Sequence, residues 1–393
     1  MLPGAIGISL DEIELISRVL DTRIPDNKNC LVFKTFEPKK IRVIAFTCIG
    51  TIGSLDKGEE RALTMKLHRT GCVAMAAILL LSGFVWSQSK QPTANNDVAK
   101  PAEIKPFLGR WDLTLYAPDH QYPSWLEISE SGGQLQGRMV GRWGSAHPIL
   151  HVKIENSALT FSSPKDEEDT PKDMPFQAKL VGGKLDGTLS GPDGTTWRWT
   201  GERAPLLNPT TVAKWGKPIR LFNGKDTTGW WFDNPRAANI WSVKDGVLVS
   251  AAHGSNIITK RKFRNFKLHV EFNCKPDCNT GVYLRGRYEV QIADNAGQDP
   301  PNRQTGSVYG FITPSPLIPL DPGTWHSYDI TLIGRTVTVV EDGQTVVDKQ
   351  EIPGITGDAL DSHEGLPGPI YLQGAEAHGG FSFRNLVITP AKD

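Results

Sequence analysis

Short runs of alternating apolar and polar residues constrain the fold of this 393-residue chain more than any other feature. Trp111, Leu113 and Leu115, for example, alternate with polar residues, as on a strand that buries one face. The 39 glycines and 28 prolines punctuate such runs with turn signals. The pattern favours an all-β protein over a helical one.

The charge balance excludes one class of partner. Lys plus Arg and Asp plus Glu both number 43, so the formal net charge is zero. A chain that holds nucleic acid through bulk positive charge would be strongly basic, and we therefore expect no nucleic-acid partner. The chain is 39% hydrophobic, which is enough apolar material to build cores.

The long apolar run Val73–Trp86 indicates an export signal. It is shorter than the roughly 20 residues that a membrane-spanning helix needs. Basic residues precede it and small residues follow it, as in a secretory signal. We therefore predict that Met65 is the true start, that residues 65–89 are a signal peptide cleaved near Ser89, and that residues 90–103 are a polar leader.

This interpretation makes residues 1–64 part of an over-extended gene model. The alternative is a genuine, poorly structured extension with an internal anchor. Export places the mature protein in the periplasm or outside the cell, without stable membrane insertion after cleavage. Cys274 and Cys278 are the cysteines that remain, and in an oxidising compartment we expect them to form a local disulfide.

The mature chain divides into two predicted domains. Residues 104–203 form a small β-barrel or meander, 204–218 a linker, and 219–393 the domain that carries any chemistry. Within the first domain, Pro164–Pro175 is expected to be a solvated loop. The predicted strands after the opening one are Ser124–Ser129, Gln134–Val140, His151–Phe161, Phe176–Val181, Lys184–Ser190 and Thr195–Thr200.

The segment Gly281–Ile292 is the most informative in the chain. As one strand, it would turn its even-numbered, mainly apolar positions to a core. The opposite face would carry large polar groups and form the floor of a polar binding cleft. An exposed sheet face laced with salt bridges is the alternative. The residues predicted to face the cleft are Tyr283, Arg285, Arg287, Glu289 and Gln291.

Glu289, Gln291 and Asp294 have the spacing E-x-Q-x-x-D. It partly resembles the E-x-D-x-x-E pattern of laminarinases and lichenases, in which two carboxylates act as nucleophile and acid. Here the middle acid is a glutamine and the last is an aspartate. The pattern therefore supports a carboxylate-bearing sugar cleft but disfavours a retaining glycosidase.

Seven blocks in the second domain carry a resemblance to a known family. Over residues 219–390 the chain resembles the 3-keto-disaccharide hydrolases, also described as 3-keto-glucoside lyases and hydratases. The resemblance implies a concanavalin A-like jelly-roll sandwich. The blocks are Leu221–Trp230, Trp241–Leu248, Gly281–Arg285 with Tyr288–Ile292, Gly306–Gly310, Trp325–Tyr328, Gly368–Gln373 and Phe383–Asn385.

The resemblance also implies a chemistry: a 3-keto-glycoside loses its C2 proton, eliminates the C1 oxygen and is then hydrated. Glu289 is expected to be a base or acid, and Arg285 or Arg287 to hold the enolate. An outward-facing Trp231 would stack on a sugar or cover a sheet edge. The remaining candidates for proton transfer and substrate contact are Asp294, Tyr309, His326 and His378. In the alternative interpretation each histidine is structural, and Asp294 caps a turn with Asn295.

Two other functions stay open. A non-catalytic carbohydrate-binding module would use the same face without turnover, and an ordinary glycoside hydrolase would act on unoxidised sugar. The expected partner is a glycoside or oligosaccharide, with a separate oxidoreductase supplying the keto group. No cofactor or metal cluster is evident, although the turn Asp358–Asp361 would accommodate a structural Ca²⁺.

Overall fold

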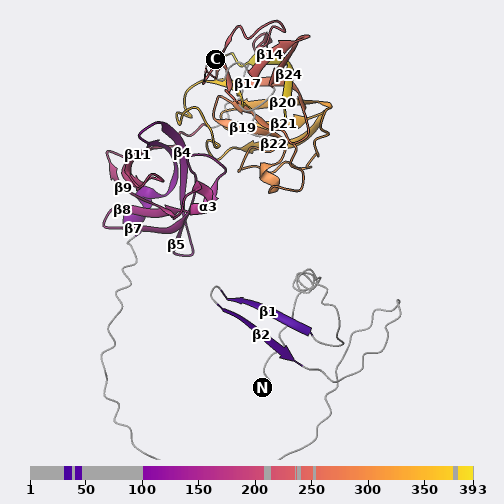
Figure 1. The fold of residues 1–393 in the computed structure, drawn as a ribbon. Coiled ribbons are helices and arrows are strands. Elements are labelled where there is room, and N and C mark those ends of the chain that lie inside the picture. The colour runs from indigo at the N-terminus through magenta and orange to yellow at the C-terminus, as the bar shows by residue number, and fades with distance from the viewer. Residues whose placement is uncertain are drawn as a thin grey trace, which may run out of the picture. The chain divides into compact units, whose positions relative to one another are not determined.

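A computed structural model gives the fold of this chain (Figure 1). The chain divides into two compact units, Met1–Gln91 and Pro92–Asp393. In the first unit, β1 (Leu31–Glu37) and β2 (Lys40–Phe46) form an antiparallel hairpin. The structure describes residues 31–37, 40–46, 101–207, 214–234, 236, 240–250, 254–374 and 379–392. The predicted signal peptide and residues 90–100 of the predicted leader lie outside them, while residues 101–103 of the leader begin the short helix α2 (Pro101–Ile104).

The second unit begins with a small β-barrel. Its nine strands are ordered β6-β5-β4-β3-β11-β10-β9-β8-β7, and the sheet curls until its ends meet. There the N–H of Ile149 donates to the carbonyl of Gly137 at 3.0 Å. The predicted small barrel is therefore confirmed. Its strands are β3 (Gly109–Tyr116), β4 (Gln121–Ser131), β5 (Gln134–Val140), β6 (His147–Pro148), β7 (Leu150–Glu155), β8 (Ala158–Ser163), β9 (Met174–Val181), β10 (Lys184–Ser190) and β11 (Thr196–Arg203).

Large side chains fill the barrel. Trp111 and Trp199 are fully buried, and the rings of Phe161 and Phe176 stack with centroids 4.8 Å apart. At one end, the guanidinium of Arg203 lies 3.7 Å from the centre of the Trp111 ring. The barrel interior is thus a packed hydrophobic core.

Two local predictions in the barrel were wrong. The run His151–Phe161 is a hairpin, because Asn156 and Ser157 have φ of 51° and 59°, and this left-handed backbone turns the chain between β7 and β8. The segment Pro164–Pro175 contains α3 (Lys165–Glu168). It is not simply a solvated loop, because Glu168 is fully buried.

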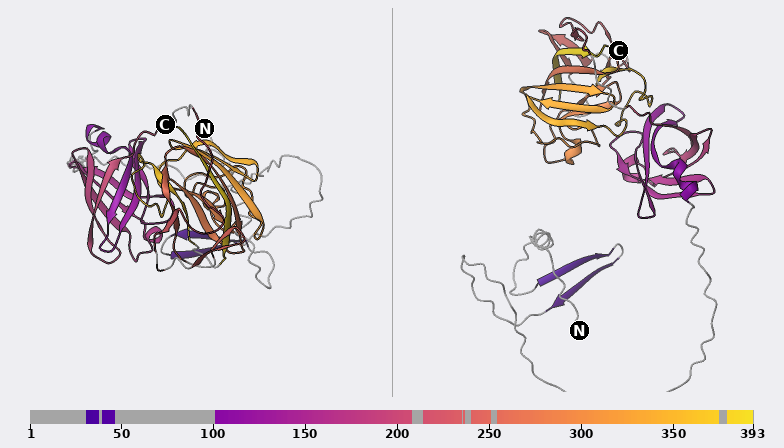
Figure 2. Two further views of the ribbon diagram at one scale, coloured as in Figure 1. Left: turned by 90° about the horizontal axis from the view of Figure 1, so that it is seen from above. Right: turned by 180° about the vertical axis from the view of Figure 1, so that it is seen from behind.

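The rest of the unit is a jelly-roll sandwich of two antiparallel sheets (Figure 2). The larger sheet has the order β14-β15-β24-β17-β20-β21-β22, with β12 paired to β24. The smaller has the order β13-β16-β23-β18-β19. The strands are β12 (Ile219–Arg220), β13 (Trp230–Phe232), β14 (Trp241–Lys244), β15 (Val247–Ser250), β16 (Ile257–Phe263), β17 (Phe266–Cys274), β18 (Asn279–Leu284), β19 (Tyr288–Ala293), β20 (Trp325–Ile333), β21 (Thr336–Glu341), β22 (Gln344–Glu351), β23 (Gly368–Leu372) and β24 (Phe381–Pro390).

The all-β prediction is confirmed, since the helical elements among the described residues are very short. They are α2 (Pro101–Ile104), α3 and the 3₁₀ turns Lys105–Phe107 and Pro301–Arg303. Among the described residues, no helix has the length and apolar character needed to cross a membrane.

The barrel and the sandwich share packing. Trp125 and Val140 of the barrel belong to the hydrophobic core of the sandwich, and the Trp125 ring meets Phe311 edge-on at 5.2 Å. The described ends of the linker are also packed, because Arg335 Nη2 donates to the carbonyl of Pro205 at 3.0 Å. The two predicted domains therefore form one compact unit.

Candidate active site

The five-stranded sheet sets a row of side chains across one face. Because directly paired residues on neighbouring strands point to the same side, the register alone defines this row. It runs from the edge strand β13 to the edge strand β19 and ends on a carboxylate. In order, its members are Trp231, Ile258, Tyr371, Tyr283 and Glu289.

A cleft of about 370 Å³ lies over the carboxylate end of this row. That volume falls within the range of sites that bind small molecules. Eight of its ten lining residues come from the sandwich and two from the barrel. They are Asn279, Tyr283, Glu289, Gln291, Tyr309, Gly357, Asp358 and Gln373, with Trp143 and Gly144 of the barrel.

Glu289 is held on the cleft floor by several contacts. Its side chain is buried, with 3% of the residue exposed, and its Oε2 accepts a hydrogen bond from the Tyr283 hydroxyl at 3.0 Å. With its amide turned to suit its neighbours, Gln291 donates to Oε1 of Glu289 at 3.1 Å. Gly281 is required beside it, because a Cβ there would collide with Oε1. The carboxylate is therefore fixed in position before any ligand binds.

Three tyrosines lie around this carboxylate. The rings of Tyr283 and Tyr371 stack with centroids 4.0 Å apart and 10° between planes, which fixes the hydroxyl of Tyr283 beside Glu289. The N–H of Tyr309 donates to the carbonyl of Glu289 at 3.1 Å, so this tyrosine runs along the edge strand β19. Both tyrosines predicted to contact substrate, Tyr283 and Tyr309, therefore line the cleft.

The predicted single strand Gly281–Ile292 is in fact the hairpin β18–β19. Arg285 and Gly286 have φ of 55° and 67°, and this left-handed backbone reverses the chain. Leu284 pairs with Tyr288, so even-numbered residues of β18 pair with even-numbered residues of β19. Paired residues point to the same side of the sheet. The predicted division into an apolar core face and a polar cleft face is preserved on both strands.

The two arginines of this turn are not brought to the cleft. Arg285 Nη2 donates to the Tyr288 hydroxyl at 2.9 Å and to the Gly334 carbonyl at 2.8 Å. Arg287 pairs with Asp361 at 2.7 Å. Both guanidinium groups are buried, since the turn carries them past the end of the polar face. Neither is placed to hold an enolate over Glu289.

Asp294 and His326 also lie elsewhere. Asp294 accepts the N–H of Asp277 at 3.0 Å. Asp277 lies in the loop between Cys274 and Cys278, which the structure joins in a disulfide. His326 is on β20 of the larger sheet, where its Nδ1 lies 2.6 Å from Asp342. These contacts give both side chains structural partners away from the cleft.

The remaining candidates have different outcomes. His378 lies outside the described residues. Trp230 is 4% exposed and its neighbour Trp231 is 43% exposed, as expected if one points inward and the other outward. Trp231 stands at the far end of the side-chain row and is not among the residues that line the cleft.

The sequence missed part of the cleft. Asn279 and Gln373 lie on the same face as Gln291, which the strand parity of β18 could have indicated for Asn279. Asp358 comes from a loop, and Trp143 comes from the other domain. Neither of these last two has a local sequence pattern that points to the cleft.

No metal centre is found in the part of the chain that the structure describes. There, no three side chains of His, Cys, Asp or Glu converge in a way that could hold a metal ion. Asp361, from the turn considered for Ca²⁺, pairs with Arg287. A structural Ca²⁺ stays a prediction.

A second group of charges lies at the boundary between barrel and sandwich. Glu364 is fully buried, accepts the Tyr288 hydroxyl at 2.7 Å and pairs with Arg335 at 3.0 Å. Asp112 of the barrel is hydrogen-bonded to Glu364. Burial, followed by the negative charge of Glu364, raises the pKa of Asp112 to about 9. The raised pKa favours the protonated form of Asp112.

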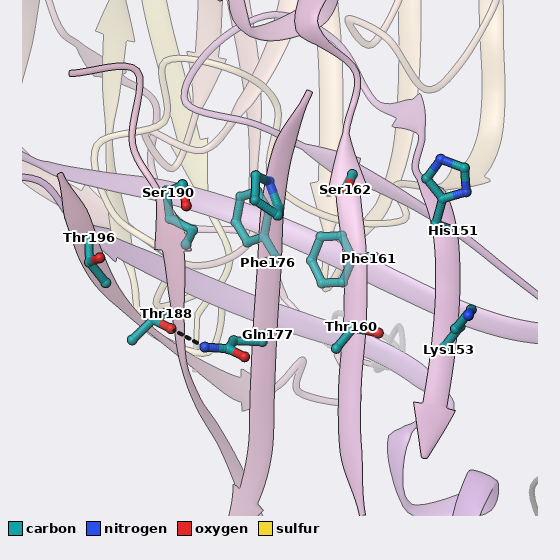
Figure 3. A pocket seen from close by; sticks show the side chains of 12 residues that line it. His151, Lys153, Thr160, Phe161, Ser162, Phe176, Gln177, Thr188, Ser190 and Thr196 are labelled. Atoms are coloured by element: carbon teal, nitrogen blue, oxygen red, sulfur yellow. Dashed lines mark hydrogen bonds between the residues drawn. The ribbon is translucent and has the colours of Figure 1, made fainter. Parts of the chain in front are cut away.

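One further hollow, of about 510 Å³, lies on the barrel across strands β7 to β11 (Figure 3). Thr160, Ser162, Ser190 and other small polar side chains surround it, and Gln177 donates to Thr188 at 2.9 Å. Phe161 and Phe176, which also line it, belong to the barrel core. Its lining includes neither a carboxylate nor an exposed Trp, Tyr or Phe ring.

The fold and the cleft together define a jelly-roll sandwich with a carboxylate on the floor of a polar cleft. Residues 217–389 match the family described as 3-keto-alpha-glucoside-1,2-lyase-like domain. The match covers the same part of the chain as the seven sequence blocks.

Among curated proteins, the chain is similar to a 3-keto-disaccharide hydrolase of Bacteroides thetaiotaomicron, at 23% identity over 33% of this chain. The match spans 57% of the length of that relative.

Solved structures that resemble the chain include a glycosyl hydrolase candidate from Parabacteroides distasonis, at 28% identity and a TM-score of 0.38 over 47% of this chain and 92% of that one. A Bacillus licheniformis β-glucanase has 12% identity and a TM-score of 0.30, over 45% of this chain and 99% of that one.

Proposed function

We propose that the cleft floored by Glu289 cleaves 3-keto-glycosides. The single observation that carries this proposal is the Glu289 carboxylate, fixed on the cleft floor with the Tyr283 hydroxyl 3.0 Å away. The match of residues 217–389 to the 3-keto-alpha-glucoside-1,2-lyase-like family supports the substrate class. The curated relative is named as a 3-keto-disaccharide hydrolase, which agrees with the proposal.

The chemistry follows from the acidity of the sugar. A ketone at C3 delocalises the electron pair left when the C2 proton is removed, so Glu289 acts as the base and becomes protonated. When the ketone re-forms, the pair makes a C1=C2 double bond and the C1–O bond breaks. The leaving oxygen then takes a proton. Water adds to C1 while C2 regains a proton, and the net change is hydrolysis.

Tyr283 and the side-chain amides complete the reaction site. The Tyr283 hydroxyl contacts Glu289 and can pass a proton between that carboxyl group and the leaving oxygen. Asn279 and Gln373 present amide groups in the same cleft, where an N–H can stabilise the enolate oxygen. They take the role that the sequence had assigned to the arginines of the turn.

The test compares an oxidised with an unoxidised substrate. The full chain is incubated with 3-keto-trehalose and with trehalose, and released glucose is measured. We expect release from the keto sugar alone, and loss of release in Glu289→Gln. Asp294→Asn is the matched control, because it neutralises a carboxylate outside the cleft. Loss of activity in Asp294→Asn but not in Glu289→Gln would reassign the base.

A non-catalytic carbohydrate-binding module on the same fold predicts a different result. Neither sugar would release glucose, yet the protein would still bind a glycan, and Glu289→Gln would weaken that binding. Release from trehalose as readily as from the keto sugar would instead indicate an ordinary glycoside hydrolase.

Export is a second part of the proposal. The Cys274–Cys278 disulfide supports export, because disulfides persist in oxidising compartments. The apolar run Val73–Trp86 supports it because the run has the form of a secretory signal. Amino-terminal sequencing of the protein recovered from the cell exterior or periplasm should find a mature start near Ser89. Recovery of an uncleaved chain from the cytoplasm would contradict export.

A further inference from the structure

A loop of the small barrel forms the second wall of the cleft. Trp143 and Gly144, in the connection between β5 and β6, line the cleft together with the residues of the sandwich. Trp143 is 37% exposed, so part of its side chain is open to contact. The question is what holds this ring there and what it would contact.

A buried ion pair holds the ring in place. The guanidinium of Arg142 lies 3.8 Å from the centre of the Trp143 ring and covers it. Arg142 Nε donates to Glu168 Oε2 at 3.1 Å, and Glu168 also accepts the Ser163 hydroxyl at 2.9 Å. Glu168 is fully buried and Arg142 is 8% exposed. Burying such a pair is expensive in desolvation, so the pair serves to fix the loop and its indole more than to add stability.

The same loop is pressed against the sandwich. A Cβ on Gly357 would collide with the carbonyl of Gly144, and a Cβ on Gly310 would come within 2.5 Å of the Ser145 Cβ. Both glycines belong to the sandwich, and each permits an approach that no larger residue allows. The wall that carries Trp143 is therefore fixed relative to the floor that carries Glu289.

A second hollow of about 370 Å³ continues the cleft, since the two share Asp358 and Gln373. Arg142 lines the second hollow and Trp143 the first, so this stacked pair marks their junction. The second hollow also contains hydrogen-bonding groups set in place. Its lining includes His120, Tyr122, Asp233, Asn256 and Tyr371.

We propose that Trp143 stacks on the second pyranose ring of a glycoside whose first ring lies over Glu289. This inference rests on the proposed function and adds a role for the barrel in recognising the sugar that leaves. The C–H bonds on one face of a pyranose are apolar and pack on an indole, while its hydroxyls stay hydrogen-bonded. Asp233 and Asn256, which hydrogen-bond to each other at 2.6 Å, are placed to receive hydroxyls beyond the junction.

The test measures binding to a full chain that carries Glu289→Gln, so that turnover is blocked. Calorimetric titrations use 3-keto-trehalose, which has two rings, and methyl 3-keto-α-glucoside, which has one. Adding Trp143→Ala should weaken binding of the two-ring sugar by roughly tenfold, the value of a well-packed aromatic contact. Binding of the one-ring sugar should change by less than about twofold.

Two further variants sharpen the result. Trp143→Phe should restore most of the affinity, since a phenyl ring also stacks. Trp231→Ala is the matched control, because it removes a similarly exposed tryptophan outside the cleft lining, and it should leave both affinities unchanged. Thermal unfolding of each variant checks that the fold is intact.

Each outcome bears on a separate claim. Unchanged binding of the two-ring sugar in Trp143→Ala, or an equal loss for both sugars, overturns the second-ring role of Trp143 and leaves the proposed function standing. A parent protein that binds neither sugar overturns the proposed function and this inference with it.

Discussion

The strands and the turn of the hairpin β18–β19 use polar side chains in different ways. The strand part with Tyr283 and Glu289 is called the open end here, and the turn with Arg285 and Arg287 is called the sealed end. Along its strands, Tyr283 and Glu289 face an open cleft and have hydrogen-bonding partners beside a space that a ligand can enter. At its turn, Arg285 and Arg287 are sealed among protein groups. A charged residue in a polar row therefore indicates a binding site only where the backbone leaves its side chain facing an open space.

The sealed end must satisfy its charges internally. Arg335, Glu364 and Asp112 lie next to the turn, and each is at least nine-tenths buried. Such a cluster holds barrel and sandwich together only while every charge has a partner. Activity should therefore depend on the open end and stability on the sealed end, and this separation can be tested.

The largest effect is expected at the open end. Glu289→Gln removes the base, and loss of a general base typically lowers the rate by about 10²–10⁴-fold. Stability should stay near that of the parent, because a glutamine can still accept the Tyr283 hydroxyl. The measurements are initial rates on 3-keto-trehalose and urea unfolding. A variant that unfolds as readily as it loses activity would erase the separation.

The next effect is expected at the sealed end. Arg335→Met leaves Glu364 buried without its 3.0 Å partner, and breaking a buried pair in this way lowers the free energy of unfolding by about 3–5 kcal/mol. The rate per folded molecule should be retained. Urea unfolding with activity assayed before the transition measures both quantities.

The control for Arg335→Met is an exposed ion pair. Arg198→Met breaks the pair with Asp186 on the barrel surface, and the unfolding midpoint should not move. A strong loss of activity in folded Arg335→Met would show that the sealed cluster also shapes the cleft.

A smaller effect is expected where the two domains touch. Gly357→Ala inserts a Cβ against the carbonyl of Gly144, and overpacking of this kind lowers stability by about 1–3 kcal/mol. Binding of a two-ring sugar should weaken as well, because the loop with Trp143 must move. Gly365→Ala is the matched control, since its nearest neighbour would be 3.8 Å away. Equal behaviour of the two variants would show that the wall is not fixed by this contact.

The sequence predicted the parts of the site that depend on strand parity. Tyr283, Glu289 and Gln291 were placed together correctly, because alternation survives a turn that pairs even positions with even ones. The prediction from strand parity failed for Arg285. The left-handed backbone at Arg285 and Gly286 ends the strand, although the alternation of apolar and polar residues continues through this turn.

The sequence could not predict the barrel's share of the cleft. Trp143 reaches it through contacts between segments more than two hundred residues apart, such as Gly144 against Gly357. Its support from Glu168 was hidden in an acidic stretch that looked solvated. Long-range packing of this kind leaves no periodic trace in either segment.

The last effect is expected only when the pH is changed. In the folded protein the pKa of Asp112 is raised to about 9, whereas in the unfolded chain it is near its ordinary value of 3.8. Between these values the folded state holds a proton that the unfolded state has lost, so unfolding releases it. The stabilisation from this group is complete below about pH 4 and is lost as the pH rises towards 9.

Asp112→Asn keeps a neutral hydrogen-bonding group next to Glu364 and removes this titration. The variant should therefore gain stability relative to the parent as pH rises from 5 to 9, by at most about 1.4 kcal/mol per pH unit. Urea unfolding of both proteins at pH 5, 7 and 9 measures the difference, in which the other titrating groups largely cancel. A difference that stays constant over this range would mean that Asp112 is already ionised at pH 5. The sealed end would then hold two negative charges side by side, and Arg287 and Arg335 would have to neutralise both.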